Sequence, residues 1–222
     1  GMTCDFVGHP VVAEPLASQD EVAALRVEGA GPVLLVLPGS RRGEVARLAP
    51  IFGQVVGRLQ AAHPGLRVLL PTVRGVAGAV RDLTSGWPVR PEIIEDADRK
   101  RTAFAAADVA LAASGTVSLE LAASGCPMVI AYDMHPITLW LMRRAALVDT
   151  VTLVNLVSET RAVPEFIGPA SRADGIAPAL EALLQYSTAQ KAAMDLTMDR
   201  LGKGGEPPGL RAARSVLAAL RR

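Results

Sequence analysis

The sequence has few cysteines and histidines, and it lacks long apolar runs. These are the features that mark disulfide-rich domains, metal sites and membrane spans. Its 222 residues include two cysteines and three histidines, and the histidines lack the spacing of metal ligands. Two thiols far apart make no disulfide framework and indicate a reducing compartment. No apolar run approaches the roughly 20 residues that a membrane helix needs. The net charge of +1 argues against a surface dedicated to nucleic acid. We therefore expect neither a metal nor a nucleic-acid partner.

What the sequence does contain is apolar bulk, at 50% of the residues, which is enough for a sizeable core. Short apolar runs of strand length lie at 33–37, 67–70, 89–94, 109–113 and 128–132. Helical stretches lie between and after them, at 45–59, 75–84, 99–107, from 116 onward and at 137–147. This alternation predicts an α/β fold with a Rossmann-like, doubly wound parallel sheet. After residue 150 we expect a short strand or loop at 151–156, and then helices at 172–186, 187–200 and 209–221.

The first candidate site is the loop Pro38-Gly39-Ser40-Arg41, which follows the apolar run at 33–37. Open α/β sheets bind ligands at the carboxyl ends of their strands. Gly39 allows the backbone to turn, and the guanidinium of Arg41 suits a phosphate. A plain turn with Ser40 as a helix cap and a surface arginine explains this loop equally well.

The second candidate site is Ser114-Gly115-Thr116, where the run at 109–113 breaks and a helical pattern starts. Backbone N–H groups and two hydroxyls at the start of a helix suit a phosphate. Glu120 lies four residues after Thr116 and shares its helix face. A capping box would need the acid three residues after the cap, so Glu120 is not that partner. Its carboxylate is then available for the hydroxyls of a sugar.

Weaker candidates lie further along the chain. Asn155 sits between apolar residues; it either satisfies backbone groups in a loop or points into the cleft. His135 follows a strand and is either a ligand contact or a polar turn residue. The stretch 137–144 combines apolar bulk with two arginines and suits core packing, a dimer surface or a membrane surface.

The remaining patterns are less informative about chemistry. Basic clusters such as Arg99-Lys100-Arg101 fit a solvated surface best. The sequence shows no Ser–His–Asp set, paired carboxylates or P-loop lysine, so it gives no support to nucleophilic or Walker-type chemistry.

An ordered set of motifs resembles the lipid-A-disaccharide synthase family over nearly the whole chain. Ser-Gly-Thr-x-x-x-Glu alone is shared with other sugar-nucleotide enzymes, whereas the full set is far more specific. The matching residues are Phe6-Val7-Gly8-His9-Pro10, Leu37-Pro38-Gly39-Ser40-Arg41, Glu44-Val45, Ala113-Ser114-Gly115-Thr116, Leu119-Glu120, Cys126-Pro127-Met128-Val129, Tyr132, Trp140 and Val154-Asn155-Leu156.

The resemblance implies a GT-B glycosyltransferase with two Rossmann-like halves, of which the carboxyl-terminal half binds the UDP-sugar donor. The family transfers 2,3-diacylglucosamine from UDP to 2,3-diacylglucosamine 1-phosphate, giving a β-1,6 disaccharide and UDP in lipid A biosynthesis. No cofactor is implied. The location implied is the cytoplasmic face of the inner membrane of a Gram-negative bacterium, with peripheral membrane contact and a possible dimer. The donor site would comprise Gly39, Ser40, Arg41, Ser114, Gly115, Thr116, Glu120 and Asn155.

On this interpretation residues 1–31 are a remnant of the inter-domain strand and linker. Residues 32–186 form the UDP-sugar-binding domain, and 187–222 form C-terminal helices. The acceptor site and the catalytic group would belong to an amino-terminal half that precedes Phe6, so we expect this chain alone to be inactive. Two alternatives remain open. One is another UDP-N-acetylglucosamine enzyme, of the 2-epimerase or muramyl N-acetylglucosaminyltransferase type. The other is a non-catalytic nucleotide-binding or oligomerisation module.

Overall fold

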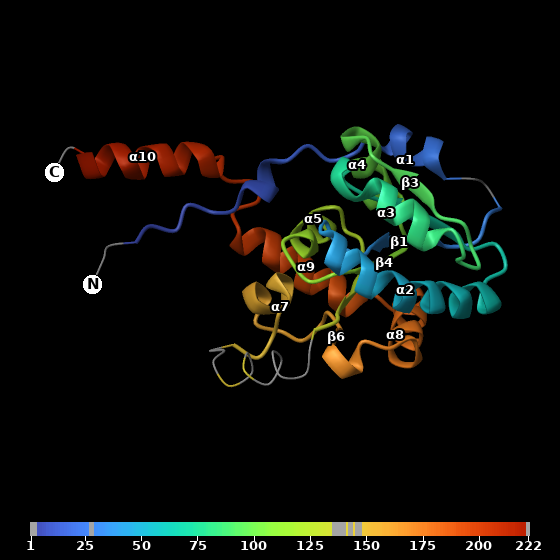
Figure 1. The fold of residues 1–222 in the computed structure, drawn as a ribbon. Helices are drawn as coiled ribbons and strands as arrows, with labels where there is room; N and C mark the ends of the chain where they lie inside the picture. The colour runs from blue at the N-terminus through green and yellow to red at the C-terminus, as the bar shows by residue number, and fades with distance from the viewer. Residues whose placement is uncertain (1–3, 27–28, 135–140, 142–143, 145–147, 221–222) are drawn as a thin grey trace.

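The computed structural model describes residues 4–26, 29–134, 141, 144 and 148–220, and these form an α/β fold around one parallel sheet (Figure 1). The strands are β1 (Val33–Leu37), β2 (Arg67–Pro71), β3 (Glu92–Ile94), β4 (Val109–Ala112), β5 (Met128–Tyr132) and β6 (Glu165–Ile167). The helices of the sheet region are α2 (Arg42–Ala62), α3 (Arg74–Thr84), α4 (Ala97–Ala106), α5 (Val117–Ala123), α7 (Leu153–Ser158) and α8 (Ala173–Gln185). The remaining helical elements are η1 (Pro10–Ala13), α1 (Gln19–Leu25), η2 (Gly168–Ala170), α9 (Thr188–Arg200) and α10 (Pro208–Leu220).

The strand order is β3-β2-β1-β4-β5-β6, and every neighbouring pair is parallel. This is the order of a Rossmann-like doubly wound sheet, in which the chain reverses direction across the sheet between β1 and β4. Ligands bind such sheets at that switch point, just beyond the carboxyl ends of the strands. The predicted fold class is confirmed, and the two candidate loops follow the two strands that flank the switch point.

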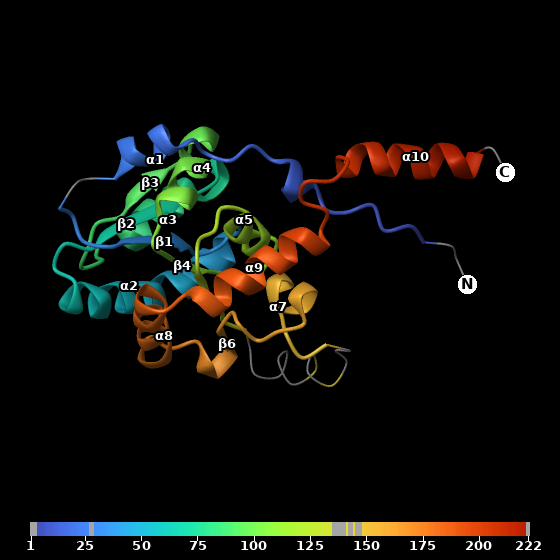
Figure 2. The ribbon, with the colours of Figure 1, turned by 180° about the vertical axis from the view of Figure 1, so that it is seen from behind.

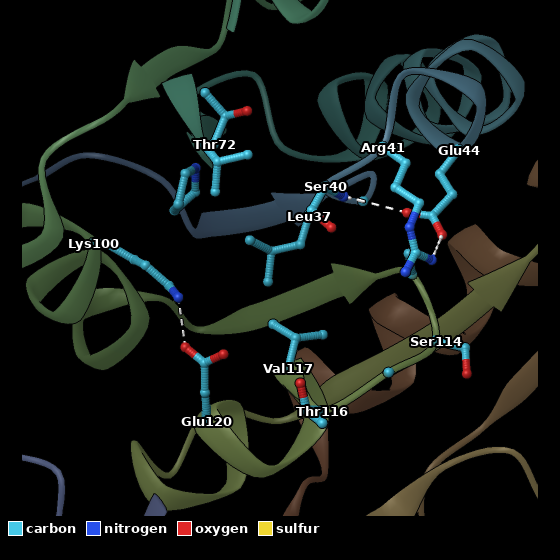
Figure 3. A pocket seen from close by; sticks show the side chains of 15 residues that line it. Leu37, Ser40, Arg41, Glu44, Thr72, Lys100, Ser114, Thr116, Val117 and Glu120 are labelled. Carbon is cyan, nitrogen blue, oxygen red and sulfur yellow. Dashed lines mark hydrogen bonds and ion pairs between the residues drawn. The ribbon is translucent and has the colours of Figure 1, made fainter. Parts of the chain in front are cut away.

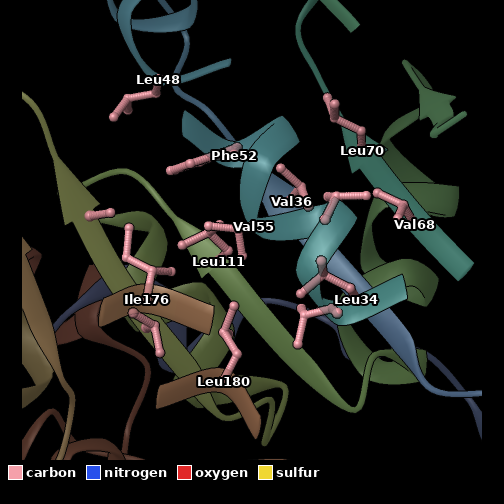
Figure 4. Packing of buried hydrophobic residues seen from close by; sticks show 14 of the residues in the cluster. Leu34, Val36, Leu48, Phe52, Val55, Val68, Leu70, Leu111, Ile176 and Leu180 are labelled. Carbon is pink, nitrogen blue, oxygen red and sulfur yellow. The ribbon is translucent and has the colours of Figure 1, made fainter. Parts of the chain in front are cut away.

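Both faces of the sheet are covered by helices, which explains why β1 is apolar throughout. Leu34 and Val36 pack under α2, α3 and α8 (Figure 4). Leu35 and Leu37 pack under α4 and α5 on the other face. The largest buried side chain is Phe52 of α2, and it has no exposed surface. At about 25 cal/mol per Å² of apolar surface, these two layers supply the main stabilisation of the sheet.

Most predicted elements are found within a few residues of their expected bounds, but the segment after residue 150 differs. We expected a strand or loop at 151–156, and this prediction is wrong, because Leu153–Ser158 forms helix α7. This helix is only six residues long and buries Val154, Asn155 and Ser158. A helix buried on several sides shows no clear amphipathic period in its sequence. Strand β6 was not expected at all.

Residues 4–9 and α10 lie close together and extend from the body of the fold, as both views show (Figures 1 and 2), whereas Val11 of η1 is buried in the core. The backbone N–H of His9 donates to the carbonyl of Leu201 at 3.2 Å, and Arg211 donates to the carbonyl of Phe6 at 3.0 Å. Helix α1 begins with a capping box, in which Ser18 and Glu21 bond to each other's backbone N–H groups. The S-x-x-E pattern that marks such a helix start is present in the sequence. None of the described helices has the length and the hydropathy needed to cross a membrane.

Candidate functional site

A cavity of about 420 Å³ opens at the switch point of the sheet (Figure 3). Its walls come from the loop after β1, the end of β2, helix α4, and the loop after β4 with the first turn of α5. Residues from both predicted loops line it, together with several that the sequence did not single out. The lining residues are Leu37, Gly39, Ser40, Arg41, Glu44, Pro71, Thr72, Val73, Lys100, Ala113, Ser114, Gly115, Thr116, Val117 and Glu120.

The loop after β4 owes its shape to Gly115, which has a φ of +148°. This backbone conformation strongly favours glycine, because an L side chain there is strained. Thr116 is the N-cap of α5, yet its side chain makes no capping hydrogen bond. Among the described residues, the N–H groups of Gly115 and Thr116 have no backbone acceptor. Two lining residues thus carry N–H groups without a backbone acceptor, and Thr116 adds a hydroxyl, which are the donor types that an anion site uses.

Ser114, in the same loop, bonds to a different part of the chain. Its hydroxyl lies 3.3 Å from the carbonyl of Val151, to which it donates a hydrogen bond. Ser114 thus ties the β4 loop to the segment that leads into α7 while it lines the cavity. Its oxygen still has acceptor capacity after this bond.

The loop after β1 is organised by Glu44 in the first turn of α2. One carboxylate oxygen of Glu44 accepts from the backbone N–H of Ser40 at 3.3 Å, and the other pairs with Arg41 at 3.2 Å. Gly39 has a φ of +115°, and a Cβ atom there would lie 2.6 Å from the Glu44 carboxylate. Any other residue at this position would be strained and would displace the Glu44 side chain. The Arg41 side chain is 82% exposed, so its cation borders the cavity rather than filling it.

Lys100 of α4 reaches the far end of the cavity and meets Glu120 of α5 (Figure 3). Its ammonium nitrogen lies 2.5 Å from Oε2 of Glu120 and 5.2 Å from the centre of the Phe104 ring. The sequence suggested only a solvated basic cluster for Lys100; the structure leaves its side chain 40% exposed and adds the contact with Glu120 at the cavity. The cavity lining thus carries two cations, Arg41 and Lys100, and two carboxylates, Glu44 and Glu120. A phosphate bound here would depend on backbone N–H donors more than on net charge.

Asn155 does not line this cavity. It is fully buried in α7, where its amide donates to the carbonyl of Val163 and accepts from the Val163 N–H, both at 2.9 Å. The prediction of Asn155 as a ligand contact is therefore corrected to a backbone-bridging role. A side-chain amide both donates and accepts, so Asn155 satisfies both backbone groups of Val163. We leave Asn155 out of the site.

Two further predictions cannot be compared with the structure. His135 and Trp140 lie outside the described residues, as does the predicted helix over 137–147 apart from 141 and 144. Within the described part of the chain, no group of three His, Cys, Asp or Glu side chains is arranged to hold a metal ion.

The sheet order defines this chain as a Rossmann-like unit, and the solved structures that superimpose on it show the fold of one half of a GT-B protein. Heptosyltransferase II of Escherichia coli, which acts with ADP-heptose, superimposes with a TM-score of 0.56 at 13% identity, covering 76% of this chain and 52% of that one. The Spinosyn rhamnosyltransferase SpnG, solved with thymidine diphosphate, gives 0.57 at 14% identity, covering 84% and 45%. UDP-GlcNAc 2-epimerase of Neisseria meningitidis, solved with UDP-GlcNAc, gives 0.53 at 14% identity, covering 92% and 49%. At these identities the likeness is one of fold.

The family is narrower than this fold class. The family model described as Lipid-A-disaccharide synthetase matches residues 1–214, and the chain belongs to this family. Lipid-A-disaccharide synthase of Ruegeria pomeroyi is 57% identical over 99% of this chain, and that of Rhodospirillum centenum is 43% identical over 98%. The chain spans only 58% and 56% of the length of these two relatives. The resemblance seen in the sequence motifs is thereby confirmed.

Proposed function

We propose that the cavity between the β1 and β4 loops holds the diphosphate and ribose of a UDP-sugar donor. The observation that carries the proposal is the placement of Gly115, Thr116 and Glu120 on one loop and helix turn at the switch point. N–H groups of the loop would bind the diphosphate, and the Glu120 carboxylate, one turn further on, would accept from ribose hydroxyls. Gly39, Ser40 and Arg41 would form the facing wall.

For the whole protein we propose the transfer of 2,3-diacylglucosamine from UDP to 2,3-diacylglucosamine 1-phosphate, which forms a β-1,6 disaccharide and releases UDP. Family membership and the donor-type cavity support this activity. As the bond to the sugar breaks, negative charge grows on the diphosphate. Oriented N–H groups, the Thr116 hydroxyl and the Arg41 guanidinium would stabilise that charge. A group that deprotonates the acceptor hydroxyl would belong to the part of the protein outside this chain.

We also retain the predicted division of the chain as a proposal. Residues 32–186 would be the donor-binding unit, 1–31 the connection to the rest of the protein, and 187–222 helices that pack beside it. Because both substrates carry acyl chains, we propose that the whole protein makes peripheral contact with a membrane. The membrane proposed is the inner membrane of a Gram-negative bacterium, at its cytoplasmic face. We also keep the dimer as a proposal. Vesicle co-sedimentation and light scattering on the whole protein test the membrane contact and the dimer.

Calorimetric titration of the 222-residue chain with UDP tests the donor site. We expect saturable binding of UDP that is weakened about ten-fold by Thr116→Val, which removes a hydrogen bond to a charged group, and also weakened by Glu120→Gln, which replaces a charged acceptor by a neutral one. Glu206→Gln is the matched control. Glu206 also forms an ion pair, at 2.9 Å from Arg214, but lies outside the cavity. The donor-site assignment fails if millimolar UDP produces no binding, or if the two site variants bind UDP as tightly as the control.

A further inference from the structure

Lys100 and Glu120 form a bridge between α4 and α5 that separates two cavities. The cavity at the switch point holds both residues in its lining, and so does a second cavity of about 270 Å³. The second cavity is lined mostly by apolar side chains and by the segment that leads into α1. Its lining residues are Val11, Glu14, Pro15, Leu16, Ala17, Ala97, Lys100, Arg101, Phe104, Glu120, Ala123 and Ser124. The bridge is therefore part of the cavity wall and not a remote surface pair.

The two charged groups are held in place and remain accessible. The Lys100 side chain is 40% exposed and the Glu120 side chain 31%. The Phe104 ring lies 5.2 Å from the ammonium nitrogen, which adds a second attraction beside the carboxylate. The ammonium group has three donors, and the carboxylate two acceptor oxygens. The recorded bond uses one donor and one oxygen, at 2.5 Å, so both groups keep capacity for a ligand.

A donor-only group beside an acceptor-only group is complementary to a hydroxyl, which donates and accepts at once. Two neighbouring hydroxyls fit such a pair better than one, because each charged group then finds its own partner. Within a nucleoside diphosphate, the ribose supplies that arrangement at its 2′ and 3′ positions. A 2′-deoxyribose lacks one of the two hydroxyls.

We propose that Lys100 is a specificity-determining residue that makes this site prefer ribonucleoside over 2′-deoxyribonucleoside diphosphates. Its ammonium group donates to the oxygen of the 2′-hydroxyl, while Glu120 accepts from the ribose hydroxyls. This inference rests on the proposed UDP site. It adds a residue, Lys100, and a discrimination between two sugars.

The pairing also limits how large the discrimination can be. When a missing ligand hydroxyl leaves a buried polar group of the site without a hydrogen-bond partner, the site discriminates against that ligand by roughly 10⁴-fold or more. Here the two charges still satisfy each other when the 2′-hydroxyl is missing, so no charge is left unpaired. We therefore expect UDP to bind about ten-fold more tightly than 2′-deoxy-UDP, as for one hydrogen bond to a charged group.

The test compares the dissociation constants of UDP and 2′-deoxy-UDP by calorimetry for the unchanged chain, Lys100→Met and Arg99→Met. Methionine matches the unbranched stem of lysine without its ammonium group, favours a helix and can still pack on Phe104. Arg99 is the matched control because it lies on the same helix and pairs with Glu92 at 2.5 Å, away from the cavity. Thermal unfolding of each variant checks that the fold is kept.

We expect Lys100→Met to weaken UDP binding by about ten-fold and 2′-deoxy-UDP binding by less than about threefold, so that the preference is lost. Arg99→Met should keep the preference of the unchanged chain. Equal weakening of both ligands by Lys100→Met would overturn the inference, because the ammonium group would then act on the phosphates or on the fold. The inference would also be overturned if Lys100→Met kept the preference for UDP over 2′-deoxy-UDP. If the unchanged chain binds UDP without preference, this inference alone fails; if it does not bind UDP, the proposed function fails as well.

Discussion

Gly39 offers a direct test of how the β1 loop is built, through the substitution Gly39→Ala. The φ of +115° at this position strains any L residue, at a cost of about 1–3 kcal/mol. The new Cβ would also lie 2.6 Å from Oε2 and 2.8 Å from Cβ of Glu44. Glu44 would have to move, and its bonds to the Ser40 N–H and to Arg41 would be lost.

We expect Gly39→Ala to lower the stability by about 2 kcal/mol, which corresponds to a fall in Tm of roughly 4–8 °C for a domain of this size. UDP binding should weaken by about ten-fold, because the displaced loop removes polar groups from the cavity wall. Circular dichroism during heating measures the first effect, and calorimetry the second.

Gly78→Ala is the matched control for Gly39→Ala. Gly78 lies in the interior of α3, is exposed, and would place its new Cβ in open space. The same chemical change should therefore raise the Tm slightly, because alanine stabilises a helix interior by about 0.5–1 kcal/mol relative to glycine. UDP binding should be unchanged. The reasoning about the β1 loop is refuted if Gly39→Ala matches Gly78→Ala in both Tm and affinity.

Three further outcomes follow from single contacts. Asn155→Ala should lower the free energy of unfolding by about 2–4 kcal/mol, because it leaves the N–H and carbonyl of Val163 buried without partners. The affinity for UDP should not change. Thermal unfolding measures the first effect and calorimetry the second. In the native chain a thiol reagent should label Cys4, which is exposed, whereas Cys126 should react only on unfolding, because burial raises the pKa of its thiol. The hydrogen bond from Arg161 lowers the pKa of Asp149, so this carboxylate stabilises the fold above the ordinary aspartate pKa and loses that effect as the pH falls through the lowered pKa. Melting curves of Asp149→Asn and the parent chain should therefore converge at the acid end.

The sheet could be predicted from the sequence because its central strands are buried on both faces. The runs at 33–37 and 128–132 match β1 and β5 in full, since each position of such a strand must be apolar. Strand β6 escaped prediction because it has only three residues, all half-buried, at the edge of the sheet. A short edge strand carries no run and little alternation for a pattern to detect.

Half of the cavity could also be predicted, because loops that follow neighbouring parallel strands meet at one edge of the sheet. Ser114, Gly115 and Thr116 were found in this way. Lys100 could not be found, because its role depends on the distance between α4 and α5 and not on its neighbours in sequence. The three consecutive basic residues at 99–101 look alike in the sequence, yet Arg99 pairs with Glu92 and Lys100 with Glu120.

The contacts of the Glu44 and Glu120 carboxylates also suggest different roles for the loops after β1 and β4. Glu44 already accepts from the Ser40 N–H and pairs with one nitrogen of Arg41, so a phosphate beside the β1 loop would meet a nearby negative charge as well as the remaining donors of Arg41. Glu120 lies one helix turn after the β4 loop, and its carboxylate is paired with Lys100. The N–H groups of Gly115 and Thr116 have no competing acceptor among the described residues. We therefore propose that a diphosphate would bind at the β4 loop, and that the β1 loop, fixed by the contacts of Glu44, would form the wall that faces it.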